Sequence, residues 1–412
     1  MRPLLRSTLV LAILSALCTS CQAADAAAAA KASKPATPIY LAVNPDLGFP
    51  ARNSISFYVA QDNQLTFTSA LSTTGFGIQG GFWGLSRVTS QPSLSAPCVY
   101  VSDAGSNDVA AISLPDLQFM GTFFASDSDN GNANGIGLAV NSNYLYASYT
   151  ASNTIATFAL ASGCGLTFLS DVSAVGKQGG SISGMAVHGT LLVVAYGDGS
   201  IESFDVSNGA PVSHNDLQNS NGYGGAAVIA PNNNGNLPAS VDITQDGKFA
   251  IFGDIAAATI VEVSSLASGK LDRTKVYRVG DGIDAGNIRL SPDERLLYIA
   301  NSEAGTVAAA FFDSATGIVS PGCTSPTLQG FNGRPWLGSV VTRDTTGTGG
   351  VVYVAEFGRD YQEINHGPSS EVGILAITSN GTTCTLNETS NSPVTLGSPG
   401  VLSIGVYPPR PF

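Results

Sequence analysis

The clearest pattern of apolar and polar positions lies in residues 287–319, NIRLSPDERLLYIANSEAGTVAAAFFDSATGIV. Residues 288–290 alternate apolar and polar, as a half-buried strand does. The following SPDE segment combines a proline with an aspartate, which predicts a tight turn. Residues 295–300 form a near-continuous apolar run that is too short for a typical helix, which favours a strand covered on both faces.

The same stretch continues with two more turns and two more predicted strands. Residues 306–312 are predicted as a third strand, although the three consecutive alanines in it favour a helix. Residues 318–320 begin a fourth strand at the edge of the sheet. Four short antiparallel strands joined by tight turns are typical of one blade of a β-propeller.

Weaker copies of this unit recur along the chain. The apolar second strand recurs at residues 39–42, 99–102, 145–148, 192–195, 250–253, 297–300 and 352–355. The short spacings between copies, 46 and 47 residues, agree with the roughly 40–50 residues of a four-stranded blade. The longer spacings contain insertions rich in Gly, Asn, Ser and Pro, which we expect in loops. The sequence therefore predicts an all-β, seven-bladed propeller of four-stranded antiparallel blades.

The two ends of the repeat region complement each other. The copy at residues 39–42 has no first strand of its own, and residues 401–407 read as a first strand without a blade after it. Joining them would complete one blade and remove the exposed strand edges of an open array. We therefore expect the C-terminal strand to close the ring; a C-terminal edge strand of a sandwich is the alternative.

The repeat, with its core SPDERLLYIAN at residues 291–301, resembles the YVTN-type repeats of seven-bladed propellers. It is especially similar to the bacterial lactonase (6-phosphogluconolactonase-like) propeller family. The resemblance covers the chain from about residue 38 to residue 408 and implies a ring around a central channel. Members of that family use histidine, arginine and acidic residues on one face of the ring. This chain has only His188, His214 and His366, and it lacks the Pro-His-rich stretch common in the family, so no catalytic residue is assigned.

Composition narrows the choice of partners. Only 12% of the residues are charged, about half of the roughly 25% usual in soluble domains. The net charge of −12 argues against nucleic acid or anionic lipid as a partner. With so few histidines we expect no metal site and no cofactor. The turn DSDNGN at residues 127–132 has Asn132 in the sixth position, where a calcium loop of the EF-hand type needs glycine together with a distal glutamate, and a solvated turn is the better interpretation.

The N-terminal 38 residues are predicted to lie outside the propeller. Residues 1–24 combine two arginines with a short apolar run, which indicates a signal peptide. Cleavage after Ala23 or lipidation at Cys21 are both compatible with the sequence, and either predicts an exported protein that is periplasmic, secreted or on the cell surface. Residues 25–38 are rich in Ala, Lys and Pro and read as a flexible tether. The propeller itself would span residues 39–412.

Loops that lead into the first strands of a propeller meet at one mouth of its channel. Here these loops contain both tryptophans, an arginine and several polar groups, which would suit a polar, anionic or sugar-like ligand. The candidate ligand-binding residues are Trp83, Asn134, Ser181, Asp281, Asp284, Asn287, Arg334 and Trp336. The structural alternative is that the tryptophans pack between blades and that Arg334 pairs with an aspartate.

Four cysteines follow the export signal: Cys98, Cys164, Cys323 and Cys384. An oxidising compartment allows disulfides, and four cysteines permit three pairings. The last three fall near the start of a fourth strand in different blades. Equivalent positions on different blades should be far apart, so we expect no pairing among those three.

Two functions are compatible with these observations. The first is a monomeric binding or scaffold protein that uses its ring faces for a protein partner or for a polar or sugar-like ligand. The alternative is a lactonase-like hydrolase of a sugar-derived or cyclic ester, in which Arg334 binds an anion and an acidic residue activates water. Contact with a membrane would need the lipid anchor at Cys21.

Overall fold

The computed structural model describes residues 38–61, 63–78, 80, 84–91, 97–132, 135–219, 237–256, 258–333, 335–342, 349–357, 371–396 and 403–410. The predicted signal peptide, the tether and Cys21 lie outside these ranges. Residues Ile39–Phe412 form one compact unit, separate from Met1–Pro38, and this unit is the propeller. In the described part, no helix is both long enough and apolar enough to pass through a lipid bilayer.

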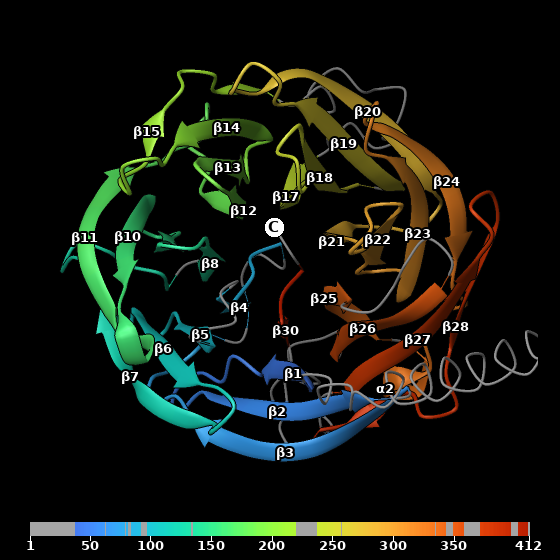
Figure 1. The fold of residues 1–412 in the computed structure, drawn as a ribbon, viewed down its shortest axis with the longest axis horizontal. Helices are drawn as coiled ribbons and strands as arrows, with labels where there is room; N and C mark the ends of the chain where they lie inside the picture. The colour runs from blue at the N-terminus through green and yellow to red at the C-terminus, as the bar shows by residue number, and fades with distance from the viewer. Residues whose placement is uncertain are drawn as a thin grey trace, which may run out of the picture. The chain divides into compact units, whose positions relative to one another are not determined.

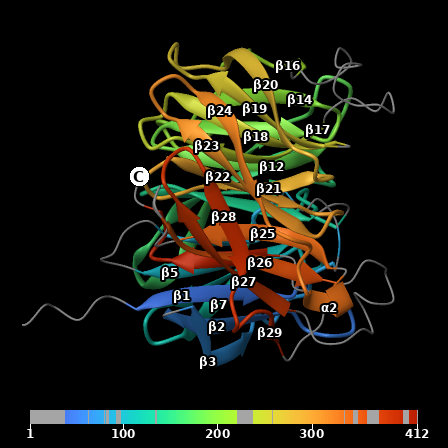
Figure 2. The ribbon, with the colours of Figure 1, turned by 90° about the vertical axis from the view of Figure 1, so that its right-hand side faces the viewer.

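Seven antiparallel sheets surround one axis as the blades of a propeller (Figures 1 and 2). From the axis outward, blade 1 contains β30 (Ser403–Tyr407), β1 (Ile39–Asn44), β2 (Ser54–Gln61) and β3 (Gln64–Ser72). Blade 2 contains β4 (Val88–Ser90), β5 (Cys98–Asp103), β6 (Asp108–Ser113) and β7 (Gln118–Phe124). Blade 3 contains β8 (Ile136–Val140), β9 (Tyr144–Tyr149), β10 (Thr154–Leu160), the turn η1 (Ser162–Cys164) and β11 (Leu166–Ser173).

Blade 4 contains β12 (Ile182–His188), β13 (Leu191–Tyr196) and β14 (Ser200–Asp205), with its outer position divided between β15 (Val212–Ser213) and β16 (Gln218–Asn219). Blade 5 contains β17 (Leu237–Ile243), β18 (Phe249–Ile255), β19 (Thr259–Ser265) and β20 (Asp272–Gly280). Blade 6 contains β21 (Ala285–Leu290), β22 (Leu296–Asn301), β23 (Thr306–Asp313) and β24 (Ile318–Thr324). Blade 7 contains β25 (Trp336–Thr342), β26 (Gly349–Phe357), β27 (Glu371–Ser379), β28 (Cys384–Glu388) and β29 (Val394–Thr395), preceded by the helical turn α2 (Gly330–Gly333).

The ring closes as predicted. β30 pairs antiparallel with β1, with Tyr407 opposite Tyr40 and Ser403 opposite Asn44 (Figure 1). All seven predicted apolar strands are the second strands of their blades. The alanine-rich stretch is also a strand, β23, because its alanines are buried between neighbouring blades, where a small side chain lets the sheets approach. Tertiary packing therefore overrides the helical preference of alanine.

The hydrophobic core is divided among the interfaces between blades. One cluster joins Tyr100 and Val109 of blade 2 to Leu145 and Phe158 of blade 3, and corresponding clusters occupy the other six interfaces. Each sheet is thus covered on both faces, which explains why the second strands are almost continuously apolar.

The innermost strands have backbone hydrogen-bonding groups on their axial edge that no further strand can pair with. Among the described residues, a hydrogen bond joins the inner segments of neighbouring blades at six of the seven interfaces. These bonds are Arg87 N to Ser403 Oγ (3.1 Å), Leu138 N to Ser86 O (2.7 Å), Ser183 Oγ to Pro238 O (2.8 Å), Leu290 N to Asp242 Oδ2 (2.9 Å), Val340 N to Asn287 Oδ1 (3.0 Å) and Ile404 N to Ser339 Oγ (2.6 Å). The bonds form a belt around the axis and satisfy buried backbone groups.

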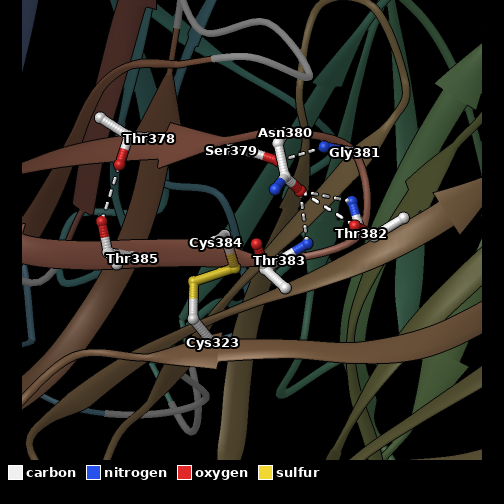
Figure 3. Close-up of a disulfide and its surroundings, with 9 residues drawn as sticks. All are labelled: Cys323, Thr378, Ser379, Asn380, Gly381, Thr382, Thr383, Cys384 and Thr385. Carbon is white, nitrogen blue, oxygen red and sulfur yellow. Dashed lines mark hydrogen bonds between the residues drawn. A yellow bond between two sulfur atoms is a disulfide. The ribbon is translucent and has the colours of Figure 1, made fainter.

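Both disulfides connect neighbouring blades. Cys98 of blade 2 bonds to Cys164 of blade 3, and Cys323 of β24 bonds to Cys384 of β28 (Figure 3). The prediction that Cys323 and Cys384 do not pair was therefore wrong. Cys323 lies near the end of its outer strand and Cys384 at the start of the next one, and their Cα atoms are 5.5 Å apart. The end of one outer strand therefore meets the start of the next outer strand along the ring.

The segment before β4 reaches across the axis. Gly84 belongs to blade 2, yet a Cβ atom there would clash with the carbonyl oxygen of Ala239 in blade 5 and lie 2.8 Å from that of Ser183 in blade 4. Because Gly84 precedes the inner strand of blade 2, its contact with the inner strands of blades 4 and 5 places this backbone in the central channel.

We expect Gly84→Ala to lower the free energy of unfolding by about 1–3 kcal/mol, because the added methyl overpacks a backbone contact. Gly165→Ala is the matched control, since a Cβ there meets its neighbours at ordinary contact distances of 3.5 and 3.6 Å. Urea unfolding followed by tryptophan fluorescence measures both. Equal midpoints for the two variants would contradict the proposed axial contact.

Candidate functional site

We call the ring face where the innermost strands begin the upper face, and the face where they end the lower face. The predicted ligand mouth is on the upper face. Trp83, Asn134 and Arg334 lie outside the described residues, as does His366. Ser181, Asp281, Asp284, Asn287 and Trp336 are described, and their positions differ widely.

Three of these residues, Asp281, Asn287 and Trp336, make contacts with neighbouring side chains or backbone groups of the propeller. Asp281 is exposed and pairs with Arg278, with 2.7 Å between the guanidinium and carboxylate atoms, so it forms a surface ion pair. Asn287 and Trp336 were expected in loops, but both lie in innermost strands, β21 and β25. Asn287 is buried and belongs to the belt, and Trp336 packs edge-to-face on Phe357 with ring centroids 6.3 Å apart. Trp336 therefore contacts a residue of its own blade, whereas the packing alternative placed the tryptophans between blades.

Ser181 lies directly before β12 and is half-buried. Its carbonyl oxygen accepts a hydrogen bond of 2.8 Å from the backbone nitrogen of Gly197, which fixes the start of the strand. The backbone of Ser181 is thereby held in place.

Asp284 has the features of a tuned acid or base. Its φ of 58° lies in the left-handed region, which is uncommon outside glycine. Backbone hydrogen bonds hold it there: its N–H donates to Ala256 O, and its carbonyl accepts from Gly286 N and Ser302 N. Burial, with the nearby charge of Glu303, raises the pKa of the Asp284 carboxyl to about 6. A half-buried carboxyl of this pKa at the start of an innermost strand can take a proton from water near neutral pH.

A second pair of perturbed carboxyls is fully enclosed between blades 1 and 2. Asp103 and Asp108 face each other at the end of the β5–β6 hairpin, and both are buried. Asn53 and Thr73 of blade 1 donate to Asp103 Oδ1, at 2.6 and 2.9 Å. Burial, followed by the charge of Asp108, raises the pKa of Asp103 to about 8. This pair holds a proton and joins two blades, but no substrate can reach it.

The sequence analysis did not predict a cluster of three charged side chains at the lower face, formed by Asp242, Arg289 and Arg410. A cavity of about 110 Å³ lies on the axis there, lined by the ends of the innermost strands and by the tail residues Pro409 and Arg410. Buried Asp242 of β17 binds Arg410 at 3.2 Å, and Arg289 of β21 lies 3.9 Å from the same carboxylate oxygen. The alternating pattern of residues 288–290 was compatible with a solvent-facing arginine, and nothing in the sequence placed the tail on the axis.

Two histidines can be placed. His188 ends β12 and is half-buried, and burial, with the charge of Arg410, lowers its pKa. His214 Nδ1 lies 2.9 Å from Ser203 Oγ, which also donates to Asp216 at 2.6 Å. Because the carboxylate binds the serine rather than the histidine, and Ser203 is fully buried, this group is no nucleophile–base arrangement.

The residues described contain no group of three or more His, Cys, Asp or Glu side chains able to hold a metal ion. In the turn at residues 127–132, Asp129 accepts hydrogen bonds from the Ser126 backbone and the Thr154 hydroxyl. That carboxylate is therefore engaged by the protein.

Residues 128–395, more than half of the chain, match the profile of the family described as "Lactonase, 7-bladed beta-propeller". The chain belongs to that family, which confirms the resemblance seen in the repeat. No curated protein sequence matches the chain.

Solved structures show the same fold at low identity. A candidate 6-phosphogluconolactonase from Bacteroides fragilis is 14% identical, with 91% of this chain and 99% of that chain covered and a TM-score of 0.62. A functionally unknown protein from Desulfotomaculum acetoxidans is 11% identical, with 90% and 100% covered and a TM-score of 0.59. A periplasmic gluconolactonase from Pseudomonas aeruginosa is 15% identical, with 70% and 82% covered and a TM-score of 0.51.

The Asp103–Asp108 pair predicts a pH effect on stability. The folded state holds a proton with a pKa of about 8 that the unfolded chain releases near the ordinary aspartate pKa of 3.8. Stability should therefore fall as pH rises from about 4 to about 8. Asp103→Asn should remove part of this fall, since its amide can donate to Asp108 as the protonated acid does. Urea unfolding at pH 5 and pH 8.5 measures the difference, and an unchanged pH dependence in the variant would contradict the shared proton.

Proposed function

We propose that this protein hydrolyses a cyclic ester, with Asp284 as the general base at the upper mouth of the ring. Membership of the lactonase propeller family supports the class of reaction. The features of Asp284 support its assignment as the general base, because its backbone is held in a strained conformation and its carboxyl has a pKa near neutrality. The binding or scaffold function has no comparable observation in its favour.

In the proposed reaction the Asp284 carboxylate takes a proton from a water molecule. The water oxygen bonds to the lactone carbonyl carbon, and the bond from that carbon to the ring oxygen breaks. The ring oxygen receives the proton, so the product is a hydroxycarboxylic acid and Asp284 returns to its carboxylate form. Arg334 directly precedes Pro335, and β25 begins at the following residue. It remains the sequence-based candidate for binding an anionic group of the substrate.

The test is hydrolysis of glucono-1,5-lactone, followed by proton release and corrected for the spontaneous rate. Asp284→Asn should lower kcat/KM by about 100-fold or more, because a general base contributes about 10²–10⁴. In the wild type, kcat/KM should rise with pH and level off above about 6 as Asp284 loses its proton. Arg334→Ala should raise KM.

Asp281→Asn is the matched control: it removes an exposed carboxylate three residues away and should leave the rate unchanged. A wild-type rate no higher than background would exclude this substrate, and a rate insensitive to Asp284→Asn would exclude the proposed base.

We also propose that the protein works outside the cytoplasm. The two disulfides support this, since disulfides persist in oxidising compartments. Cell fractionation should find the protein outside the cytoplasm, and a Cys21→Ser variant separates the two forms of export. Release from the membrane only in the variant would indicate lipidation, whereas a soluble wild type would indicate ordinary secretion. Retention of the wild type in the cytoplasm would contradict the proposal.

A further inference from the structure

We propose that the axial cavity at the lower face is a second site, separate from the upper mouth, that binds a short-chain aliphatic carboxylate through Arg289. The cavity volume is about 110 Å³, several times the roughly 10–15 Å³ that one water molecule needs by the same measure, so a small organic acid can enter.

The buried carboxylate of Asp242, which lines the cavity, already accepts hydrogen bonds at both of its oxygen atoms. Asp242 Oδ1 accepts hydrogen bonds from the Ile243 backbone at 2.9 Å and from Arg410 at 3.2 Å. Its Oδ2 accepts from Leu290 N at 2.9 Å and from Arg410 at 3.4 Å. Asp242 therefore positions the two arginines and has little capacity left for a ligand.

Arg410 is also occupied. Besides Asp242, it donates to the carbonyl oxygen of Ile243 and lies 3.9 Å from Glu294. Two carboxylates thus face this guanidinium, and its side chain is only 6% exposed. Arg410 lines the cavity and holds Asp242 in place, and its charge is balanced.

Arg289 is different. Among the described residues, its one contact with a charged group is the 3.9 Å approach to Asp242, which is longer than a hydrogen bond, and its side chain is 30% exposed. Its guanidinium makes no hydrogen bond within the described part of the chain, yet Arg289 lines the cavity. A guanidinium carries five N–H donors in a planar arrangement that matches the two oxygens of a carboxylate.

The walls define the rest of the ligand. Most of the other lining side chains are aliphatic, among them Leu138, Val187, Val341, Ile404 and Val406 from four other blades. Hydroxyl groups are contributed by Ser86, Thr89, Ser90 and Thr342, and those of Ser90 and Thr342 already donate to backbone carbonyls. An aliphatic wall favours a hydrocarbon chain over a sugar, whose hydroxyl groups would lose hydrogen bonds with water there. The combination of one available guanidinium and an aliphatic wall selects a short fatty acid.

Binding is tested by calorimetric titration with sodium butyrate at constant ionic strength. The uncharged isostere butyramide is the ligand control. Wild-type protein should bind butyrate saturably and butyramide at least tenfold more weakly. Arg289→Gln should weaken butyrate binding at least tenfold, whereas Arg295→Gln, an exposed arginine of the same blade, should not.

A second variant covers the case in which Arg289→Gln does not fold. Ala186 lines the cavity and is half-buried, so Ala186→Leu extends into the cavity and should abolish binding with Arg289 intact. Equal affinity for butyrate and butyramide, no saturable butyrate binding by the wild type, or wild-type affinity in a folded variant of either kind would overturn the proposal. Asp284→Asn should bind butyrate normally, so failure of the proposed hydrolysis and failure of this site are distinguishable.

Discussion

The structure depends on how the axial edge of each innermost strand is satisfied. A blade of four strands has an outer edge that water can reach and an inner edge that faces other blades across a narrow axis. Side chains such as Ser339, Asn287 and Asp242 each bind a backbone N–H of the next blade, which replaces the missing strand. A buried N–H without such a partner would cost about 1–3 kcal/mol. The belt therefore links neighbouring blades with the directional bonds that the apolar interfaces cannot supply.

The same constraint determines where chemistry can occur. Polar side chains near the axis are mostly used by the belt or by ion pairs: Asn287 binds a backbone nitrogen, and buried Arg87 binds Asp46. In the described part of the chain, groups outside this set are few. Asp284 stands just before its strand begins, and Arg289 lies near its strand's end, so blade 6 carries one available group toward each face. The proposed upper site for proton transfer and the proposed lower site for anion binding can therefore be altered independently.

The sequence predicted the architecture well because the repeat is a local signal. Apolar runs such as residues 297–300 identified the second strand of each blade. The incomplete units at the two ends of the repeat region identified the blade that closes the ring. Contacts between blades were not predictable in the same way. The Cys323–Cys384 pair depends on opposite strand ends meeting across an interface, and the sequence repeat does not encode that geometry. The positions of Asn287 and Trp336 differed because strand limits in polar, glycine-rich stretches depend on neighbouring blades. Arg289 and Arg410 come together with Asp242 only through the ring, over sequence distances that no motif spans.

Blade 1 is built from both ends of the propeller, and this affects how the chain can fold during synthesis. β1 emerges early, but its inner neighbour β30 is made only after all the other blades. Throughout translation, the nascent chain presents an unpaired, apolar strand border that could capture another unfinished polypeptide. Chaperone protection of that border until the final segment leaves the ribosome would be most valuable for this blade.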